Sequence, residues 1–150
     1  KIIKGERMSK KMIAISGGFD PIHIGHVRMI EEASKHGSVM VILNSDEWLQ
    51  RKKGYVFMPW KERAYIIGNI KGVSMVTNVN DSDNTVCQAL KRHKPTAFAN
   101  GGDRKTDNTP EMNVCKELGI ELMWNIGGDK IQSSSELVNN SQKHKGEQNV

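Results

Sequence analysis

The feature that constrains this chain most is a ten-residue stretch rich in glycine and histidine, Gly17-Gly18-Phe19-Asp20-Pro21-Ile22-His23-Ile24-Gly25-His26. It follows the apolar run 12–15 and precedes 27–35, where apolar residues recur at helical spacing. The stretch is therefore predicted to join a buried strand to a helix through a tight turn. The N–H groups of such a turn and of the helix start favour a bound anion.

The two histidines of this stretch are three residues apart, and a glycine precedes the second one. This spacing predicts that His23 and His26 lie side by side over one phosphate, with Gly25 allowing a close approach of backbone or ligand. The alternative is a tight turn that carries two surface histidines.

The rest of the chain alternates between strand and helix patterns. Strands are predicted at 12–15, 38–44, 73–79, 97–99 and 120–124. Helices are predicted at 27–35, from 45, from Pro59, from a cap at Asn84 or Thr85 to Leu90, from a cap at Thr109 to Gly119, and as a short segment after Ser133. Short connections between such elements indicate an α/β fold, a Rossmann-like doubly wound parallel sheet of five strands in a single domain.

In such sheets ligands bind outside the carboxyl ends of the strands. Four segments follow predicted strands and are expected to meet at one crevice. They are the glycine and histidine stretch, the residues after Asn44, the residues after Asn100 and the serines at 133–135.

Charge and composition exclude several classes. The net charge is +5, but residues 12–140 hold 15 basic and 15 acidic residues, so the body is neutral and no nucleic-acid partner is expected. No run approaches the roughly 18–20 apolar residues of a membrane span, so the expected localisation is cytoplasmic, without membrane contact. Cys87 and Cys115 lack metal spacing and are expected to be buried thiols.

The ends of the chain differ in composition from its body. Residues 1–7 precede Met8, which resembles a natural start, and are expected to be an added or disordered lead. Residues 8–138 form the expected domain. Residues 139–150 are polar and are expected to form a disordered tail.

The glycine and histidine stretch resembles the G-x-F-D-x-x-H-x-G-H signature of the cytidylyltransferase-like nucleotidyltransferase superfamily. It matches at Gly17, Phe19, Asp20, His23, Gly25 and His26. A spaced motif in a strand, loop and helix context is far more specific than a lone glycine pattern.

Three further segments extend the resemblance over most of residues 12–138. They are Asn44-Ser45-Asp46 with Lys53-Gly54 and Pro59-x-x-x-Arg63, then Asn100-Gly101-Gly102-Asp103, then Gln132-Ser133-Ser134-Ser135. The first two resemble the branch that joins a nucleotide to heptose phosphate or glycerol phosphate. The third resembles the second superfamily signature, I-S-S-T or I-S-T-T.

The resemblance implies that an acceptor phosphate attacks the α-phosphorus of CTP or ATP and expels pyrophosphate. His23, His26 and Lys53 would carry catalysis, and Lys53 and Arg63 would bind substrate phosphates. The resemblance implies a nucleotide site formed by Gly17, Gly18, Phe19, Asp20, Gly25, Asn100, Gly102, Asp103, Ser133, Ser134 and Ser135. Mg²⁺ would arrive with the triphosphate, with Asp20 near it through water, and the protein would be a homodimer.

Each of these residues also has a simpler interpretation. Lys53 and Arg63 are also compatible with solvated helix faces. Ser133 and Glu136 are compatible with a helix cap alone. Asp103 suits an ordinary turn. The three tryptophans, Trp48, Trp60 and Trp124, favour core or interface positions over base stacking.

The chain departs from the family pattern at three places. Gln132 replaces the usual isoleucine of the second signature, and Ser135 replaces its threonine. Gly18 stands where many relatives have threonine, which removes a hydroxyl near the triphosphate. These departures leave the base and the acceptor open.

Other interpretations compete with this one. His23-Ile24-Gly25-His26 is also the signature of class I aminoacyl-tRNA synthetases, but 150 residues leave no room for an anticodon-binding domain. An adenylyltransferase acting on a cofactor precursor is nearer. A catalytically idle nucleotide sensor on the same fold and a basic RNA-binding protein complete the alternatives.

Overall fold

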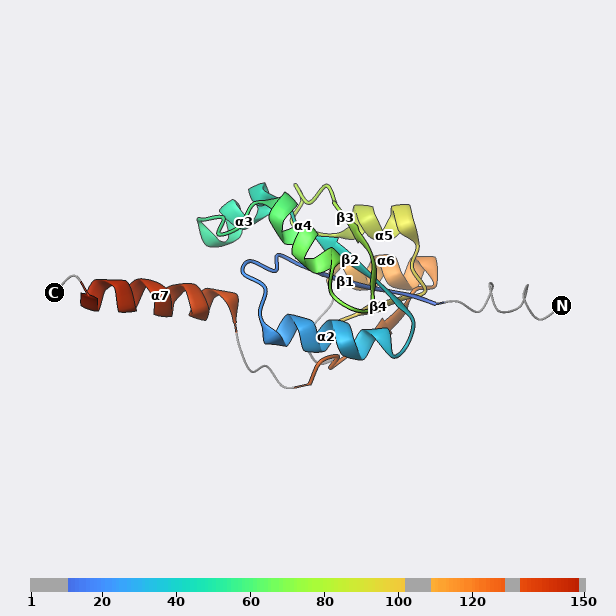
Figure 1. The fold of residues 1–150 in the computed structure, drawn as a ribbon. Coiled ribbons are helices and arrows are strands. Elements are labelled where there is room, and N and C mark those ends of the chain that lie inside the picture. Colours follow the sequence, from blue (N-terminus) through green and yellow to red (C-terminus); the bar gives the residue numbers. More distant parts are fainter. Residues whose placement is uncertain (1–10, 102–108, 129–132, 149–150) are drawn as a thin grey trace.

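The computed structural model of the protein describes residues 11–101, 109–128 and 133–148. Strands and helices alternate along most of this part of the chain (Figure 1). In chain order the elements are β1 (Met12–Gly17), α2 (Ile24–Ser34), β2 (Ser38–Leu43), α3 (Asp46–Lys53), α4 (Trp60–Gly68), β3 (Val73–Thr77), α5 (Cys87–His93), β4 (Ala97–Ala99), α6 (Pro110–Leu118), β5 (Glu121–Met123) and α7 (Ser134–Gln148).

The five strands form one sheet in the order β3-β2-β1-β4-β5, and every pair is parallel. The chain runs outward from β1 through β2 to β3 and then crosses back to β4 on the other side of β1. Strand order therefore reverses at β1, where open α/β sheets bind ligands. The predicted fold class is confirmed.

Two apolar cores lie on opposite faces of the sheet because alternate residues of a strand point to opposite sides. Ile13 and Ile15 of β1 pack with Ile30 of α2 and Ile67 of α4. Ala14, between them, belongs to the other core, which includes Leu90 of α5 and residues of α6. Helices thus cover both faces, and the central strand is buried on both sides.

The thiols and one of the tryptophans have structural roles. Cys87 and Cys115 are free and buried in the core beneath α5 and α6, as predicted. Trp60 packs against the other core and donates its indole N–H to the Leu43 carbonyl at 3.1 Å.

Several helix ends differ from prediction because side chains define the caps. Helix α2 begins at Ile24, three residues early, because His23 caps it. Pro59 is the N-cap of α4 and not its first residue. Helix α5 begins at Cys87 after Val86, because Asn84 has a positive φ of 65° and Thr85 is held in a turn by Asp83. Ser133, as predicted, accepts from the Glu136 N–H at 3.0 Å.

Helix α7 differs most from prediction. It runs from Ser134 to Gln148 and extends away from the rest of the described chain (Figure 1). The expected short helix with a disordered tail from Asn139 is therefore wrong over 139–148, where the backbone is helical. No proline interrupts this stretch, so no residue in it lacks the backbone N–H that a helix requires.

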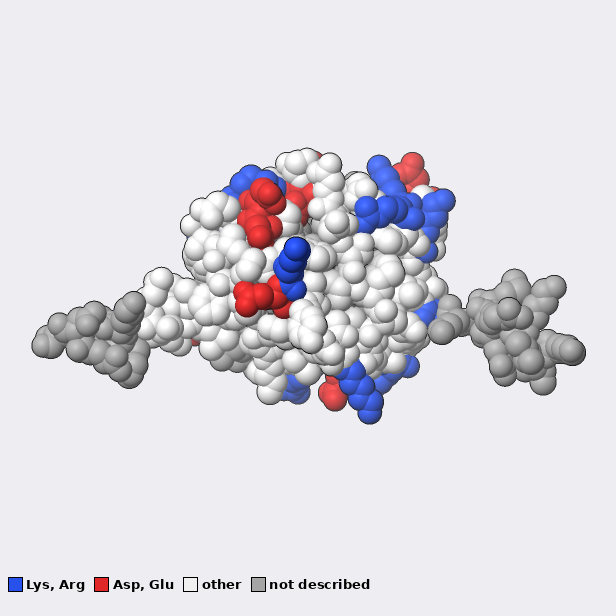
Figure 2. All heavy atoms as spheres, turned by 45° about the horizontal axis from the view of Figure 1, so that its top comes forward, with Lys and Arg blue, Asp and Glu red and all other residues white. Residues whose placement is uncertain are grey.

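Charges of both signs share the surface. On the face shown in Figure 2, Lys and Arg side chains form separate groups, and acidic side chains lie beside several of them. That face therefore lacks the continuous basic stripe that favours a nucleic-acid backbone.

Candidate functional site

The glycine and histidine stretch lies at the carboxyl end of the central strand. β1 ends at Gly17, and α2 begins at Ile24. The stretch thus faces the point where strand order reverses, as the sequence predicts. It is anchored to β2, because the Asn44 N–H donates to the Gly17 carbonyl at 3.0 Å.

The two histidines are brought together as predicted. Their rings stack with centroids 3.8 Å apart and an angle of 24° between the planes. His26 Nδ1 accepts from the His23 N–H at 3.1 Å, and His23 Nδ1 accepts from the Gly25 N–H at 3.0 Å. The two imidazoles thus satisfy backbone donors at the start of α2, where no intrahelical partner exists.

These hydrogen bonds fix the proton on each neutral ring. A nitrogen that accepts from a backbone N–H carries no hydrogen, so in the neutral imidazole the hydrogen is on Nε2. Burial, aided by the charges of His23 and Lys53, lowers the pKa of His26 to about 3. His26 is therefore a neutral Nε2–H donor at physiological pH.

The neighbours of the histidines shape the ring positions. A Cβ on Gly25 would lie 2.8 Å from Cε1 and 3.1 Å from Nδ1 of His23, so only glycine leaves room for that ring. Phe19 is buried and meets His26 edge-on, with centroids 4.6 Å apart at 70°. The spacing of the motif thus sets the packing of both rings.

Gly18 has no space for the threonine of many relatives. A Cβ there would lie 2.8 Å from Leu49 Cδ2 and 3.3 Å from Trp48 Cζ3. Helix α3 therefore packs directly against the loop, and Trp48 and Leu49 occupy the space of the missing side chain. The sequence gives no sign of this contact, because the two segments are about 30 residues apart.

Asp20 differs from its predicted role near a metal. Its side chain is fully buried, and its two oxygens accept from the N–H groups of Phe57 and Met58, each at 2.6 Å. A carboxylate in this position holds the loop before α4 and does not fit a metal or its water shell. In the described part of the chain, no group of three or more His, Cys, Asp or Glu side chains could hold a metal ion.

Lys53 lies at the end of α3 within electrostatic reach of the motif. Burial lowers its pKa from 10.5, Asp20 raises it and Arg63 lowers it further. The charge of Lys53 in turn lowers the pKa of His26. The charge of Lys53 thus acts on His26, and its predicted contact with a substrate phosphate stays a prediction.

Arg63 is buried and faces inward. Only 1% of the residue is exposed, and its guanidinium donates to three backbone carbonyls and to the Asp46 carboxylate. These bonds do not fit the predicted direct contact with a substrate phosphate. The donors of the guanidinium are directed at carbonyl groups of the protein and at a carboxylate. The sequence left its burial open, because the acceptors come from distant segments.

The second signature meets the first. Ser134 Oγ donates to the Pro21 carbonyl at 2.6 Å, which holds the start of α7 against the glycine and histidine stretch. Ser133 caps α7, and Ser135 is exposed. The N-terminus of a helix thus lies beside the predicted phosphate site.

The loop after β4 follows the same edge of the sheet. The Asn100 N–H donates to the Met123 carbonyl at 2.8 Å, and its carbonyl accepts from the Ile126 N–H at 3.0 Å. Asn100 therefore holds the ends of β4 and β5 together. Gly102 and Asp103, predicted in the nucleotide site, lie outside the described residues, as does Gln132.

Asp81 is a buried residue at this edge that sequence reasoning missed. It is 3% exposed, and its carboxylate accepts from Asn44 Nδ2 and from the N–H and hydroxyl of Ser45. It fixes the turn between β2 and α3. It lies in the polar stretch 78–85, which is typical of a loop, so the sequence pattern did not indicate that its side chain is buried.

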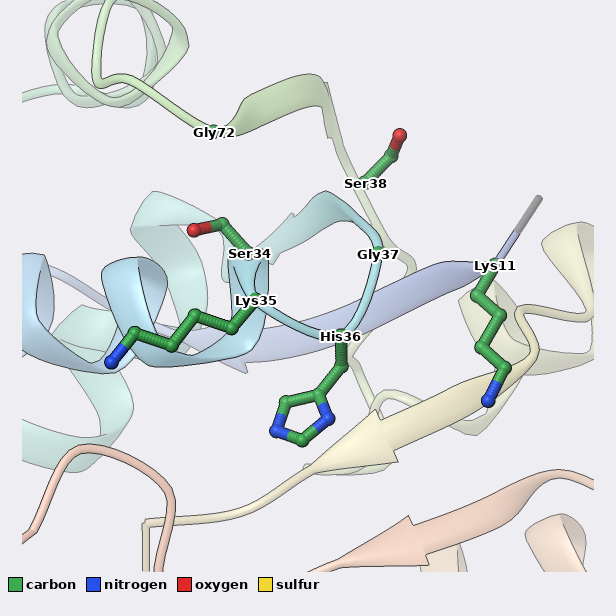
Figure 3. Close-up of a pocket in the computed structure, with 7 residues that line it drawn as sticks. All are labelled: Lys11, Ser34, Lys35, His36, Gly37, Ser38 and Gly72. Atoms are coloured by element: carbon green, nitrogen blue, oxygen red, sulfur yellow. The ribbon is translucent and has the colours of Figure 1, made fainter.

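A separate hollow lies at the opposite edge of the sheet (Figure 3). It is lined by Lys11, Ser34, Lys35, His36, Gly37, Ser38 and Gly72. These residues precede β1, β2 and β3, begin β2 or end α2. The labelled side chains point in different directions, so they do not converge on one ligand.

In the described residues, no helix is long and apolar enough to cross a membrane.

Comparisons with known proteins agree with this geometry. Residues 14–147 match the model of a family described as cytidylyltransferase-like. A protein named bifunctional protein HldE from Aliarcobacter butzleri is 27% identical over 143 residues, which are 93% of this chain and 29% of the relative. Its namesake from Geotalea uraniireducens is 33% identical over 143 residues, 91% of this chain and 29% of the relative. The chain spans less than a third of the length of these relatives.

A solved structure shares the fold. The lipopolysaccharide core biosynthesis protein from Thermoplasma volcanium aligns with a TM-score of 0.62 at 23% sequence identity. The alignment covers 76% of this chain and 93% of that chain.

Proposed function

Because the chain belongs to the cytidylyltransferase-like family of nucleotidyltransferases, we propose that it transfers CMP or AMP from CTP or ATP to a sugar or polyol phosphate. The family match confirms the resemblance found in the sequence. The acceptor class rests on the order of motifs from Asn44 to Arg63, which resembles the sugar-phosphate branch.

The observation that carries the proposal is the stacked pair of histidines at the start of α2. Both Nδ1 atoms accept from backbone N–H groups, so each ring, when neutral, carries its hydrogen on Nε2. Preorganised donors of this kind stabilise negative charge that develops on phosphate oxygens. A neutral donor also avoids the strong ground-state binding that a full charge would give to substrate and product alike.

In the proposed reaction an oxygen of the acceptor phosphate forms a bond to the α-phosphorus. The bond between that phosphorus and the bridging oxygen breaks, and its electron pair leaves with pyrophosphate. No protein nucleophile is required, since such transfers depend on positioning and charge stabilisation. The Mg²⁺ bound to the triphosphate enters as part of the substrate.

Each part of the site then has a task. His23 and His26, with the N–H groups of Gly18 and Phe19, stabilise the α-phosphate. Lys53 binds the acceptor phosphate and draws it toward the α-phosphorus. The start of α7 holds the β- and γ-phosphates through backbone N–H groups at a helix N-terminus.

Two wider properties follow from the same resemblance and belong to the proposal. We expect a homodimer that acts on small molecules and not on nucleic acid. A catalytically idle sensor on this fold would bind triphosphate without turnover, so turnover separates it from the enzyme.

The test is pyrophosphate release, with Mg²⁺ present, over a grid of four ribonucleoside triphosphates and a panel of sugar, polyol and amino-alcohol phosphates. We expect one base and one acceptor class to give a signal well above all others. Release with pantetheine phosphate or nicotinamide mononucleotide alone would instead support the cofactor-precursor enzyme. Triphosphate binding without release from any pair would contradict transfer to these acceptors.

A further inference from the structure

Arg63 is a buried charge with an unusual set of partners. Its side chain is 0% exposed, although a guanidinium removed from water costs several kcal/mol unless it is paired and hydrogen-bonded. Such a charge is tolerated only where its surroundings are built around it. The partners of Arg63 therefore show what the charge organises.

Four acceptors from four segments surround the guanidinium. Nε donates to the Met58 carbonyl at 2.8 Å, and Nη1 donates to the carbonyls of Gly18 at 2.8 Å and Asn44 at 2.9 Å. Nη2 forms an ion pair with Asp46. One planar fork thus reaches the motif loop, the end of β2, the start of α3 and the residue before Pro59.

The same segments are also held from the opposite side. Asp20, two residues after Gly18, accepts from the N–H groups of Phe57 and Met58. The Met58 residue is therefore fixed through its N–H by Asp20 and through its carbonyl by Arg63. The loop that carries the proposed phosphate amides and the segment that follows Lys53 form one hydrogen-bonded unit.

We propose that Arg63 is a positioning residue that couples the motif loop to the lysine of α3 from behind the site, with Asp46 as its counter-ion. This inference rests on the proposed function. Arg63 holds the carbonyl side of Gly18 and both ends of the path through α3 to Met58, so it sets the spacing between the loop amides and Lys53. A misplacement of about 1 Å can lower the rate of such transfers by about a hundredfold.

Electrostatics agree with this placement. Burial is the main cause of the lowered pKa of Lys53, and the charge of Arg63 adds to it. The guanidinium thus lies near the lysine without exposing a donor surface to solvent. The direct phosphate role implied by the family resemblance is replaced by an indirect one.

The test compares Arg63→Lys and Asp46→Asn with Arg51→Lys as a matched control. Lysine keeps the charge but lacks the planar fork. Arg51 is exposed, and its guanidinium donates to the Asp81 carbonyl and the Asn84 side chain and makes none of the bonds that hold Gly18 or Met58. For each folded variant, kcat, both KM values and the triphosphate Kd from calorimetry are measured.

We expect R63K to lower kcat by about tenfold or more while the triphosphate Kd changes less than about threefold, because the phosphate ligands remain. D46N should lower kcat in the same direction but less, and the double variant should resemble R63K. R51K should match the unaltered protein. A Kd raised tenfold in R63K with D46N unaffected would mean direct phosphate binding and overturn the proposal.

Hydrogen exchange gives a readout that needs no substrate. Amides in 17–20 and 54–60 should exchange faster in R63K and D46N than in the unaltered protein, and R51K should leave them unchanged. Unchanged exchange in R63K would overturn the coupling. If no substrate pair reacts at all, the proposed function fails, and the exchange rates still decide whether Arg63 links the two segments.

Discussion

At the scale of single residues, the charge state of His26 is the property on which the proposed chemistry depends most. Its pKa is lowered to about 3, chiefly by burial, so the folded chain keeps this imidazole neutral where an ordinary histidine titrates. The two Nδ1 hydrogen bonds also require the Nε2–H form. At neutral pH His26 therefore acts as a hydrogen-bond donor and not as a cation.

This neutrality predicts how stability depends on pH. Between about pH 6.5 and 3 the unfolded chain binds a proton at His26 and the folded chain does not, so the free energy of unfolding falls as pH decreases through that window. His26→Asn removes this titration, so its stability should depend less on pH there. Urea unfolding at pH 7 and pH 4.5 measures both slopes. Equal slopes in His26→Asn and the unaltered chain would refute the lowered pKa.

Lys53 is expected to act on the acceptor. Its pKa is lowered, chiefly by burial, and its charge lowers the pKa of His26. Lys53→Ala should raise the acceptor KM by about tenfold or more, since an ionic hydrogen bond to phosphate is lost. The triphosphate KM should change much less. Lys52→Ala, which removes the neighbouring charge beside Trp48, is the control. Acceptor kinetics that are unchanged in Lys53→Ala would remove it from the site.

At the scale of the element, the glycine and histidine stretch determines how helix α2 begins. The helix begins with both imidazoles in place of the usual short polar caps. Gly25→Ala should displace the His23 ring, because its Cβ would lie 2.8 Å from Cε1. We expect kcat to fall by about tenfold or more through lost positioning.

The control for this substitution is another glycine in a helix. A Cβ on Gly68, at the end of α4, would have Val76 Cγ2 at 3.9 Å as its nearest neighbour, which is an ordinary contact. Gly68→Ala should therefore leave kcat unchanged and leave stability equal or higher. Steady-state kinetics and thermal unfolding of both variants decide the matter. A Gly25→Ala variant with unaltered kcat would mean that the position of His23 does not matter.

Elements were predictable where their signals are local. The strand 97–99, the cap at Thr109 and the αL glycine at 119 follow from nearby residues and are confirmed. The start of α5 was missed because the Asn84 N–H donates to the Asp81 carbonyl and Thr85 donates to the Asp83 side chain, so both residues belong to a turn before the helix. A short final helix was predicted, but the length of α7 was missed because a polar composition favours disorder without forbidding a helix.

At the scale of the whole molecule, strand order explains why distant segments meet. Strands are added on one side of β1 up to β3 and on its other side from β4, so the carboxyl ends of β1 and β4 border one crevice. Alternation of strands and helices predicted this convergence, and the bond from Ser134 to Pro21 confirms part of it. The sequence could identify His23 and His26 because their spacing is local.

The interior charges could not be identified in the same way. Asp20 and Arg63 were assigned to ligands, but all their partners except the Met58 carbonyl bound by Arg63 lie 17 to 45 residues away in the chain. Whether a charged side chain faces solvent, ligand or backbone depends on those tertiary contacts. A family motif therefore names the important positions without separating the residues that touch substrate from those that hold the site in shape.

The most direct test of the central claim is the rate of pyrophosphate release from the productive substrate pair for His26→Ala beside His36→Ala. His36 is exposed in the turn after α2, at the opposite edge of the sheet. Loss of one preorganised donor predicts a fall of about a hundredfold or more in kcat for His26→Ala. His36→Ala should retain the full rate. A rate near that of the unaltered protein in folded His26→Ala would contradict the account.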